Sequence, residues 1–79
     1  MINKRQRNRI KKVLPFYIVK TKELLKTKGL EYTDDYIRHV FSGVRNNIII
    51  EKAILEAYQR KLQELQDLEA EKEKLFQKK

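Results

Sequence analysis

Apolar residues recur at helical spacing in four stretches of the chain, and proline, glycine and short polar segments separate these stretches. Residues 3–14 have a narrow apolar face that stops before Pro15, because proline disfavours helical geometry in the residue that precedes it. Residues 16–28 have a wider apolar face. Gly29 follows them as a suitable left-handed end residue, with Leu30 placed for the hydrophobic contact of a Schellman motif. The pattern predicts helices over 3–14 and 16–28.

A third helix is predicted over residues 33–43. Thr33 is a good N-cap, and the two acids that follow it stand in the first turn, where the helix dipole favours negative charge. The apolar positions of this stretch follow the i, i+3, i+4, i+7 rule, so we expect them to face the core: Ile37, Val40, Phe41 and Val44. Gly43 is expected to end the helix.

From residue 48 to the end of the chain there is no glycine or proline, which predicts one helix over 48–78, about 45 Å long. Its first half has the residues expected to pack on the preceding helices: Ile49, Ile50, Ala53, Ile54 and Ala57. Farther on the apolar positions thin out into a stripe suited to self-association: Tyr58, Leu62, Leu65, Leu68 and Leu75. An isolated helix with so thin a stripe is marginal in water, so a second copy is its simplest partner.

The expected fold is therefore all-α, with three short helices and a long C-terminal helix that would form a dimeric coiled coil. We call residues 1–58 the body and residues 59–79 the tail. Residues 1–9 form either a frayed helix end or a mobile basic arm, because residues 3–9 offer nothing to bury.

The charge of the chain divides near the start of the predicted long helix. The 79 residues have a net charge of +8, from 19 Lys and Arg against 11 Asp and Glu. Residues 1–50 hold twelve of the bases and four of the acids, whereas residues 51–79 hold seven of each. The cationic part indicates a polyanionic partner such as nucleic acid.

Several function classes are disfavoured by composition. With no cysteine and one histidine, neither a cysteine zinc site nor a multi-histidine site is possible, so we expect no metal and no cofactor. No nucleophile–base pair or phosphate-binding glycine loop is present, and we expect neither an enzyme nor a small-molecule substrate. The longest apolar run has three residues, and no signal peptide is apparent, so we expect a cytoplasmic protein without a membrane partner.

The stretch from Tyr36 to Asn47, with the apolar helix after it, resembles the recognition helix and exit of the lambda-repressor/Cro class of helix-turn-helix regulators. In that class the recognition helix commonly ends in an aromatic residue or leucine, a polar residue and a glycine, before a basic, asparagine-rich turn. Here these places are taken by Phe41, Ser42, Gly43 and the turn Arg45-Asn46-Asn47. The resemblance is strongest over residues 33–57, and two features depart from it. The segment from Gly29 to Thr33 is about two residues longer than the turn of that class, and Leu25 replaces its small residue.

The resemblance implies that a helix over 33–43 enters the major groove of double-stranded DNA. It assigns contacts with base edges to Asp34, Asp35, Arg38 and His39, and contacts with phosphates to Thr33, Ser42, Arg45, Asn46 and Asn47. Asp34 and Asp35 have a second interpretation, as dipole partners that never reach a base. The basic residues near the N-terminus either contact DNA or form a solvated helix face: Arg5, Arg7, Arg9, Lys11 and Lys12.

Two functions remain open at this level. One is a repressor-like transcriptional regulator that binds operator DNA as a homodimer through its C-terminal helix. The other is a non-enzymatic coiled-coil adaptor or accessory protein whose basic body binds RNA or an acidic protein.

Overall fold

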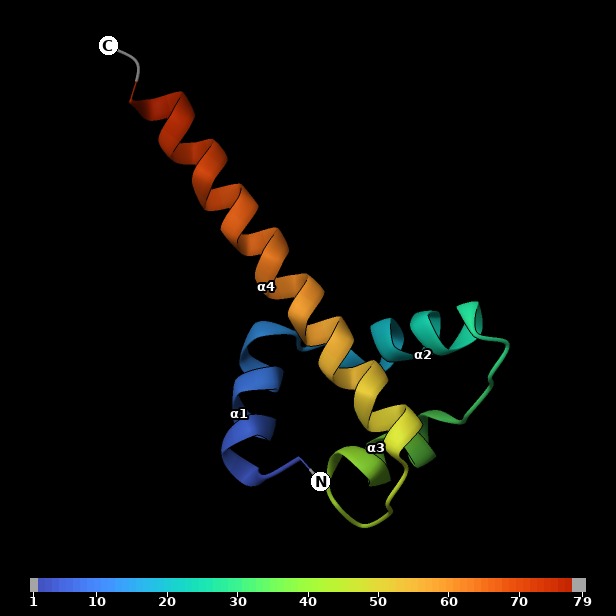
Figure 1. The fold of residues 1–79 in the computed structure, drawn as a ribbon. Helices are drawn as coiled ribbons and strands as arrows, with labels where there is room; N and C mark the ends of the chain where they lie inside the picture. The colour runs from blue at the N-terminus through green and yellow to red at the C-terminus, as the bar shows by residue number, and fades with distance from the viewer. Residues whose placement is uncertain (1, 78–79) are drawn as a thin grey trace.

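The computed structural model describes residues 2–77, and the chain is all-helical with a long C-terminal helix, as predicted (Figure 1). The four helices are α1 (Lys4–Val13), α2 (Tyr17–Thr27), α3 (Asp34–Phe41) and α4 (Ile48–Phe76). Each begins and ends within two residues of its predicted position, and residue 78 of the last prediction lies outside the described residues. Within the described range, no helix is both long and apolar enough to cross a membrane.

The end of α2 confirms the predicted Schellman motif. Gly29 has a φ of +74°, and its N–H donates to the carbonyl of Lys26 at 3.0 Å. The N–H of Leu30 donates to the carbonyl of Leu25 at 2.9 Å, and the Leu30 side chain packs on the core. These bonds satisfy carbonyls that the helix end would otherwise leave free.

The end of α3 confirms the prediction for Gly43 and contradicts the one for Val44. The helix stops at Phe41, and Gly43, with a φ of +86°, turns the chain away from the helix axis. The N–H of Val44 then donates back to the carbonyl of His39 at 2.9 Å. Because the turn carries Val44 off the helix, its side chain is 68 % exposed, and the prediction that it joins the core is wrong.

The N-terminal segment is better ordered than the sequence analysis expected. The Asn3 side chain accepts from the Gln6 N–H at 2.8 Å, and the Gln6 side chain accepts from the Asn3 N–H at 2.9 Å. This reciprocal capping box starts α1 at Lys4, and Ile2 is buried in the core. The interpretation of residues 1–9 as a frayed end or mobile arm is therefore wrong for residues 2–9, and residue 1 lies outside the described range.

The first half of α4 forms the centre of the core, and each of the other three helices packs against it (Figure 1). Ile50, Ala53 and Ile54 are fully buried there, and Ala57 is almost so. Ile49, which was also expected in this interface, is 43 % exposed because adjacent residues of a helix point about 100° apart. Around this centre lie the largest buried side chains of the other helices: Ile10, Leu25, Ile37 and Phe41.

Beyond the body, α4 runs on as a single projecting helix and gives the molecule a longest dimension of 53 Å (Figure 1). Tyr58 still packs against the core, and Leu62 is half-buried. The later apolar residues face solvent: Leu65, Leu68, Leu75 and Phe76. The body thus has its own core, whereas none of residues 59–77 is buried.

One buried polar group stands out at the centre of α2. Among the side chains that the structure describes, the Thr21 hydroxyl is buried without a hydrogen-bond partner. An unpaired buried hydroxyl costs about 1–3 kcal/mol of desolvation. We therefore predict that Thr21→Val, which keeps the shape and removes the hydroxyl, raises the free energy of unfolding by about 1 kcal/mol in urea titrations.

Thr27→Val is the matched control, since the exposed Thr27 hydroxyl donates to the carbonyl of Leu24 at 2.6 Å. It should leave stability unchanged or lower it slightly. Equal effects of the two substitutions would contradict the assignment of a cost to the Thr21 hydroxyl.

Candidate nucleic-acid interface

The outer face of α3 is polar and open to solvent. Its buried edge, with Ile37 and Val40, is fixed on the core. The residues to which base-edge contacts were assigned are all exposed. Asp35 and His39 lie opposite the buried edge with Arg38 beside them, and Asp34 lies at the edge of α3 toward α2. A helix held by one apolar edge with short polar and cationic side chains opposite has the shape that a major groove accepts.

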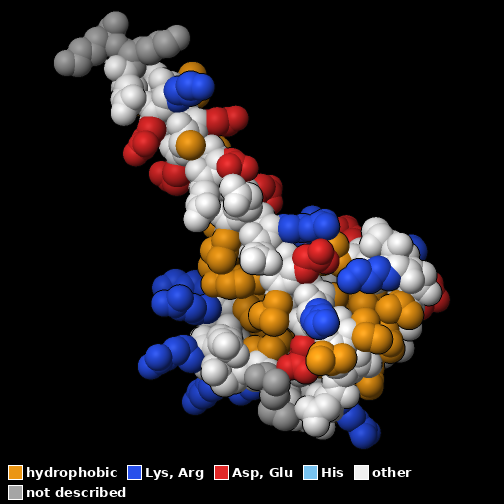
Figure 2. All heavy atoms as spheres, in the orientation of Figure 1, with side chains coloured by type: hydrophobic (Ala, Val, Ile, Leu, Met, Phe, Trp, Pro, Cys, Tyr) orange, Lys and Arg blue, Asp and Glu red, His pale blue; other side chains and the backbone are white. Residues whose placement is uncertain are grey.

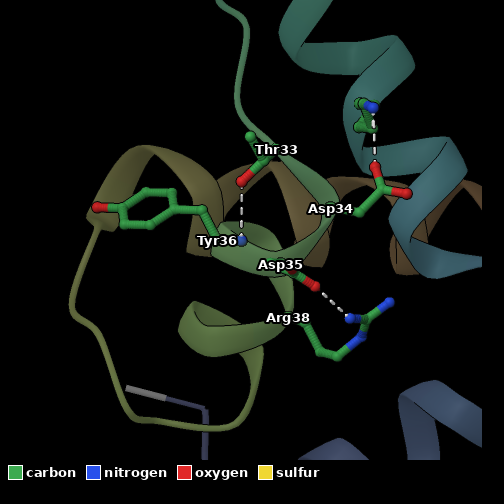
Figure 3. A network of polar contacts seen from close by, with 6 residues as sticks. Thr33, Asp34, Asp35, Tyr36 and Arg38 are labelled. Atoms are coloured by element: carbon green, nitrogen blue, oxygen red, sulfur yellow. Dashed lines mark hydrogen bonds and ion pairs between the residues drawn. The ribbon is translucent and has the colours of Figure 1, made fainter.

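Both carboxylates on this face are paired within the chain (Figure 3). Asp34 accepts from the Lys22 ammonium at 2.8 Å, which links the start of α3 to α2, and Asp35 accepts from Nη1 of Arg38 at 2.7 Å. All four side chains are about half-exposed or more, so each pair contributes less than about 1 kcal/mol to stability. The pairs orient side chains, and the position of both acids in the first turn also suits the helix dipole.

The side chains assigned to phosphates differ in whether their hydrogen-bonding groups are already engaged within the protein. The Thr33 hydroxyl accepts from the Tyr36 N–H at 3.2 Å, which leaves its own hydrogen available to a phosphate (Figure 3). The Ser42 hydroxyl donates to the carbonyl of His39 at 3.2 Å, so its hydrogen is already engaged. Arg45 and Asn46 are exposed in the turn after α3.

Asn47 has a structural role that the sequence analysis did not predict. Its side-chain oxygen accepts from the N–H groups of Ile49 and Ile50, at 3.0 and 3.2 Å, and so caps α4. Its side-chain nitrogen donates to the Tyr36 hydroxyl at 3.4 Å, which ties the cap to α3. An asparagine directly before an apolar helix is a recognisable N-cap signal, so this role was available from the sequence.

The fold brings the front of α3 and the α3–α4 turn around one shallow, open depression. Its lining consists of the half-buried Tyr36 and six exposed residues: Thr33, Asp35, His39, Val44, Arg45 and Asn46. Five of these seven residues were assigned to DNA from the sequence. Asp34, Arg38, Ser42 and Asn47 lie outside the depression on neighbouring parts of the same segments.

The basic residues of α1 fall into two groups. Arg5, Arg9 and Lys12 share one shallow, exposed surface with Lys4 and Asn8. Arg7 instead donates to the carbonyl of Ile2 at 3.1 Å, and the Lys11 ammonium lies 5.9 Å from the ring centre of Phe41 in α3. Figure 2 shows basic side chains projecting from the α1 side of the body. The structure thus separates one predicted basic run into an outward set and a set turned toward the protein.

Tyr17 joins α2 to α3 beneath this face. Its ring stacks on Phe41 with a centroid distance of 4.1 Å. Burial raises the pKa of the Tyr17 phenol above its ordinary value, and the positive charge of Arg38 opposes this shift. The raised pKa means that the folded body prefers the neutral phenol.

This preference gives a pH dependence. A raised folded-state pKa contributes stability below the unfolded-state value of 10.0, and this contribution is lost as pH rises through the folded-state pKa. We predict that, above pH 10, the free energy of unfolding falls more steeply in the unsubstituted chain than in Tyr17→Phe. Parallel urea titrations of both chains across this range provide the measurement. Identical pH profiles would contradict the assignment.

No group of three or more His, Cys, Asp or Glu within residues 2–77 is placed to hold a metal ion. No protein-family model, curated protein or solved structure matched the chain in the three comparisons made.

Proposed function

We propose that the chain is a sequence-specific double-stranded DNA-binding protein, a small repressor-like regulator that acts as a dimer joined through its tail. The observation that carries this proposal is the orientation of α3. Ile37 and Val40 are buried in the core, whereas Arg38 and His39 face solvent. In this proposal α3 lies in the major groove, and the Arg38 guanidinium reads a guanine through its O6 and N7.

The charge distribution supports the same partner. All of the net charge of +8 resides in residues 1–50, which include α1, α2 and α3. Lysine and arginine side chains near phosphates release condensed counterions, which supplies affinity for any sequence and makes it depend on salt. Arg45 and the outward side of α1 serve this role, while α3 supplies the preference for one sequence.

An adaptor that binds RNA or an acidic protein is the second candidate, and the exposed apolar residues of the tail favour it. An adaptor would need the tail for its binding activity. In the DNA-binding proposal a body of residues 1–58 that stays folded still binds DNA, with lower affinity because each body engages a half-site alone.

The first test concerns Arg38. We expect Arg38→Ala to weaken binding to a site selected from random duplexes by roughly ten- to hundredfold, from the loss of about 1–3 kcal/mol of base discrimination. Binding to unrelated duplexes should change much less. Gel-shift titrations at fixed low salt measure both affinities.

Arg60→Ala is the matched control, because it removes the same charge from an exposed arginine of the tail. It should leave the preference for the selected site intact. Equal losses in the two variants, or no duplex binding at low salt by the unsubstituted chain, would overturn the proposal.

A second test concerns Asp35, whose carboxylate stands on the DNA-facing side and holds Arg38. Asp35→Asn removes one charge that repels phosphates and loosens the guanidinium. We expect affinity for unrelated duplexes to rise by about threefold or more, while the preference for the selected site falls. Glu64→Gln in the tail makes the same charge change and should alter neither quantity. Unchanged or lower affinity of Asp35→Asn for unrelated duplexes would place α3 away from the DNA.

A further inference from the structure

The tail has an apolar stripe that continues into a groove of the body. The groove lies between the α1–α2 turn and the middle of α4, and its apolar lining includes Leu14, Phe16, Leu24 and Ala57. Phe16 is 72 % exposed there. The α4 side of this groove passes Lys61 and leads directly onto the outer face of the tail, where Leu65 and Leu68 lie.

The far end of the tail matches the groove in position as well as in chemistry. Leu75 and Phe76 are 71 % and 85 % exposed. Each lies 18 residues, or five complete helical turns, beyond Ala57 and Tyr58 respectively, so the two pairs occupy the same sides of α4. In two antiparallel helices related by a two-fold axis, residues on the same side of each helix meet across the seam.

We propose that two copies pair through antiparallel tails, so that Leu75 of each copy packs on the groove beside Ala57 and Phe16 of the other. The two-fold axis passes between Leu65 and Leu68, which places each of these leucines opposite the other in the partner copy. The inference deepens the dimer in the proposed function and rests on that part of it alone, since pairing of the tails requires no DNA.

In this arrangement the two tails overlap along most of their length. Residues 57–76 of each helix face the partner, a length of about 30 Å. Pairing of the two copies covers the exposed side chains of Leu75, Phe76 and Phe16 together. The groove is completed by the second copy, which supplies the apolar residues that the body lacks at this place.

Charge favours the antiparallel direction over the parallel one. Residues 57–63 contain two bases and no acid, and residues 69–74 contain three acids and two bases. Antiparallel pairing sets these segments against each other. Lys61 then lies at the level of Lys72 of the second copy, with Glu71 and Glu73 on either side of that lysine in sequence, and the facing segment as a whole has more acids than bases. Parallel pairing sets each segment against itself and brings two cationic bodies together, which like-charge repulsion opposes. Figure 2 shows the acidic side chains following one another along the tail, away from the body.

The antiparallel arrangement also sets the distance between the bodies. The two Ala53 positions would lie about 40 Å apart along the seam. A parallel coiled coil would instead start both tails at the same level.

The absence of cysteine from the chain allows a direct test. With the axis between Leu65 and Leu68, position 61 of one copy lies opposite position 72 of the other. Position 61 is about 16 Å along the seam from its own equivalent, too far for a disulfide. In this test, full-length Lys61→Cys and Lys72→Cys are each oxidised alone and as a mixture. The products are then separated by non-reducing electrophoresis. Ala70→Cys, on the far side of the helix from the seam, is the control.

We expect the mixture to form the 61–72 disulfide at least about tenfold more than either chain alone forms a homodimer, a preference of about 1.4 kcal/mol. Ala70→Cys should form almost none. Homodimers of each single variant would establish a parallel pair and overturn the inference, while leaving a tail-mediated dimer in place. A monomeric mass in sedimentation equilibrium, with no disulfide in any sample, would overturn the inference and the dimer together. Duplex binding is measured separately and is independent of either result.

Discussion

The packing of three helices against the first half of α4 is the constraint on which the whole structure depends. A chain of 79 residues without a disulfide has one small core, and α4 supplies its centre through Ile50, Ala53 and Ile54. The two alanines of this half, at 53 and 57, let the neighbouring helices approach closely. The position of α3 and the exposure of its polar face follow from this packing, because a helix as short as α3 does not persist alone.

The candidate interface is held by contacts at both ends of α3. At its start, Asp34 reaches Lys22 of α2 and Thr33 caps the helix. At its end, Tyr17 stacks on Phe41. The Asn47 side chain, which caps α4, reaches back to Tyr36 in the first turn of α3. These contacts are individually modest and mostly at the surface. Together they set the direction of α3 relative to α2 and α4, and so the direction in which its polar face meets a partner.

The features set by residues close together in the sequence could be predicted from it. The features set by contacts between distant segments could not. Pro15 and Gly29 interrupt the apolar periodicity at helix ends, so the helices were predictable to within two residues. The exposure of Val44 depends on the course of the chain after Gly43, which periodicity does not contain. The pair between Lys22 and Asp34 spans two helices and requires their distance in space. The capping box at Asn3 and the N-cap at Asn47 could have been predicted from the sequence, but apolar periodicity alone does not reveal them.

In the proposed function, the polar face of α3 and the turn after it bind duplex DNA, and the tail does not. An ¹⁵N-labelled full-length chain titrated with a mixed-sequence duplex at low salt tests this residue by residue in heteronuclear NMR spectra. We expect amide shifts to change around Arg38, His39, Arg45 and the outward side of α1, and residues 65–76 to remain unshifted. Shift changes concentrated in the tail, or none at all, would contradict it.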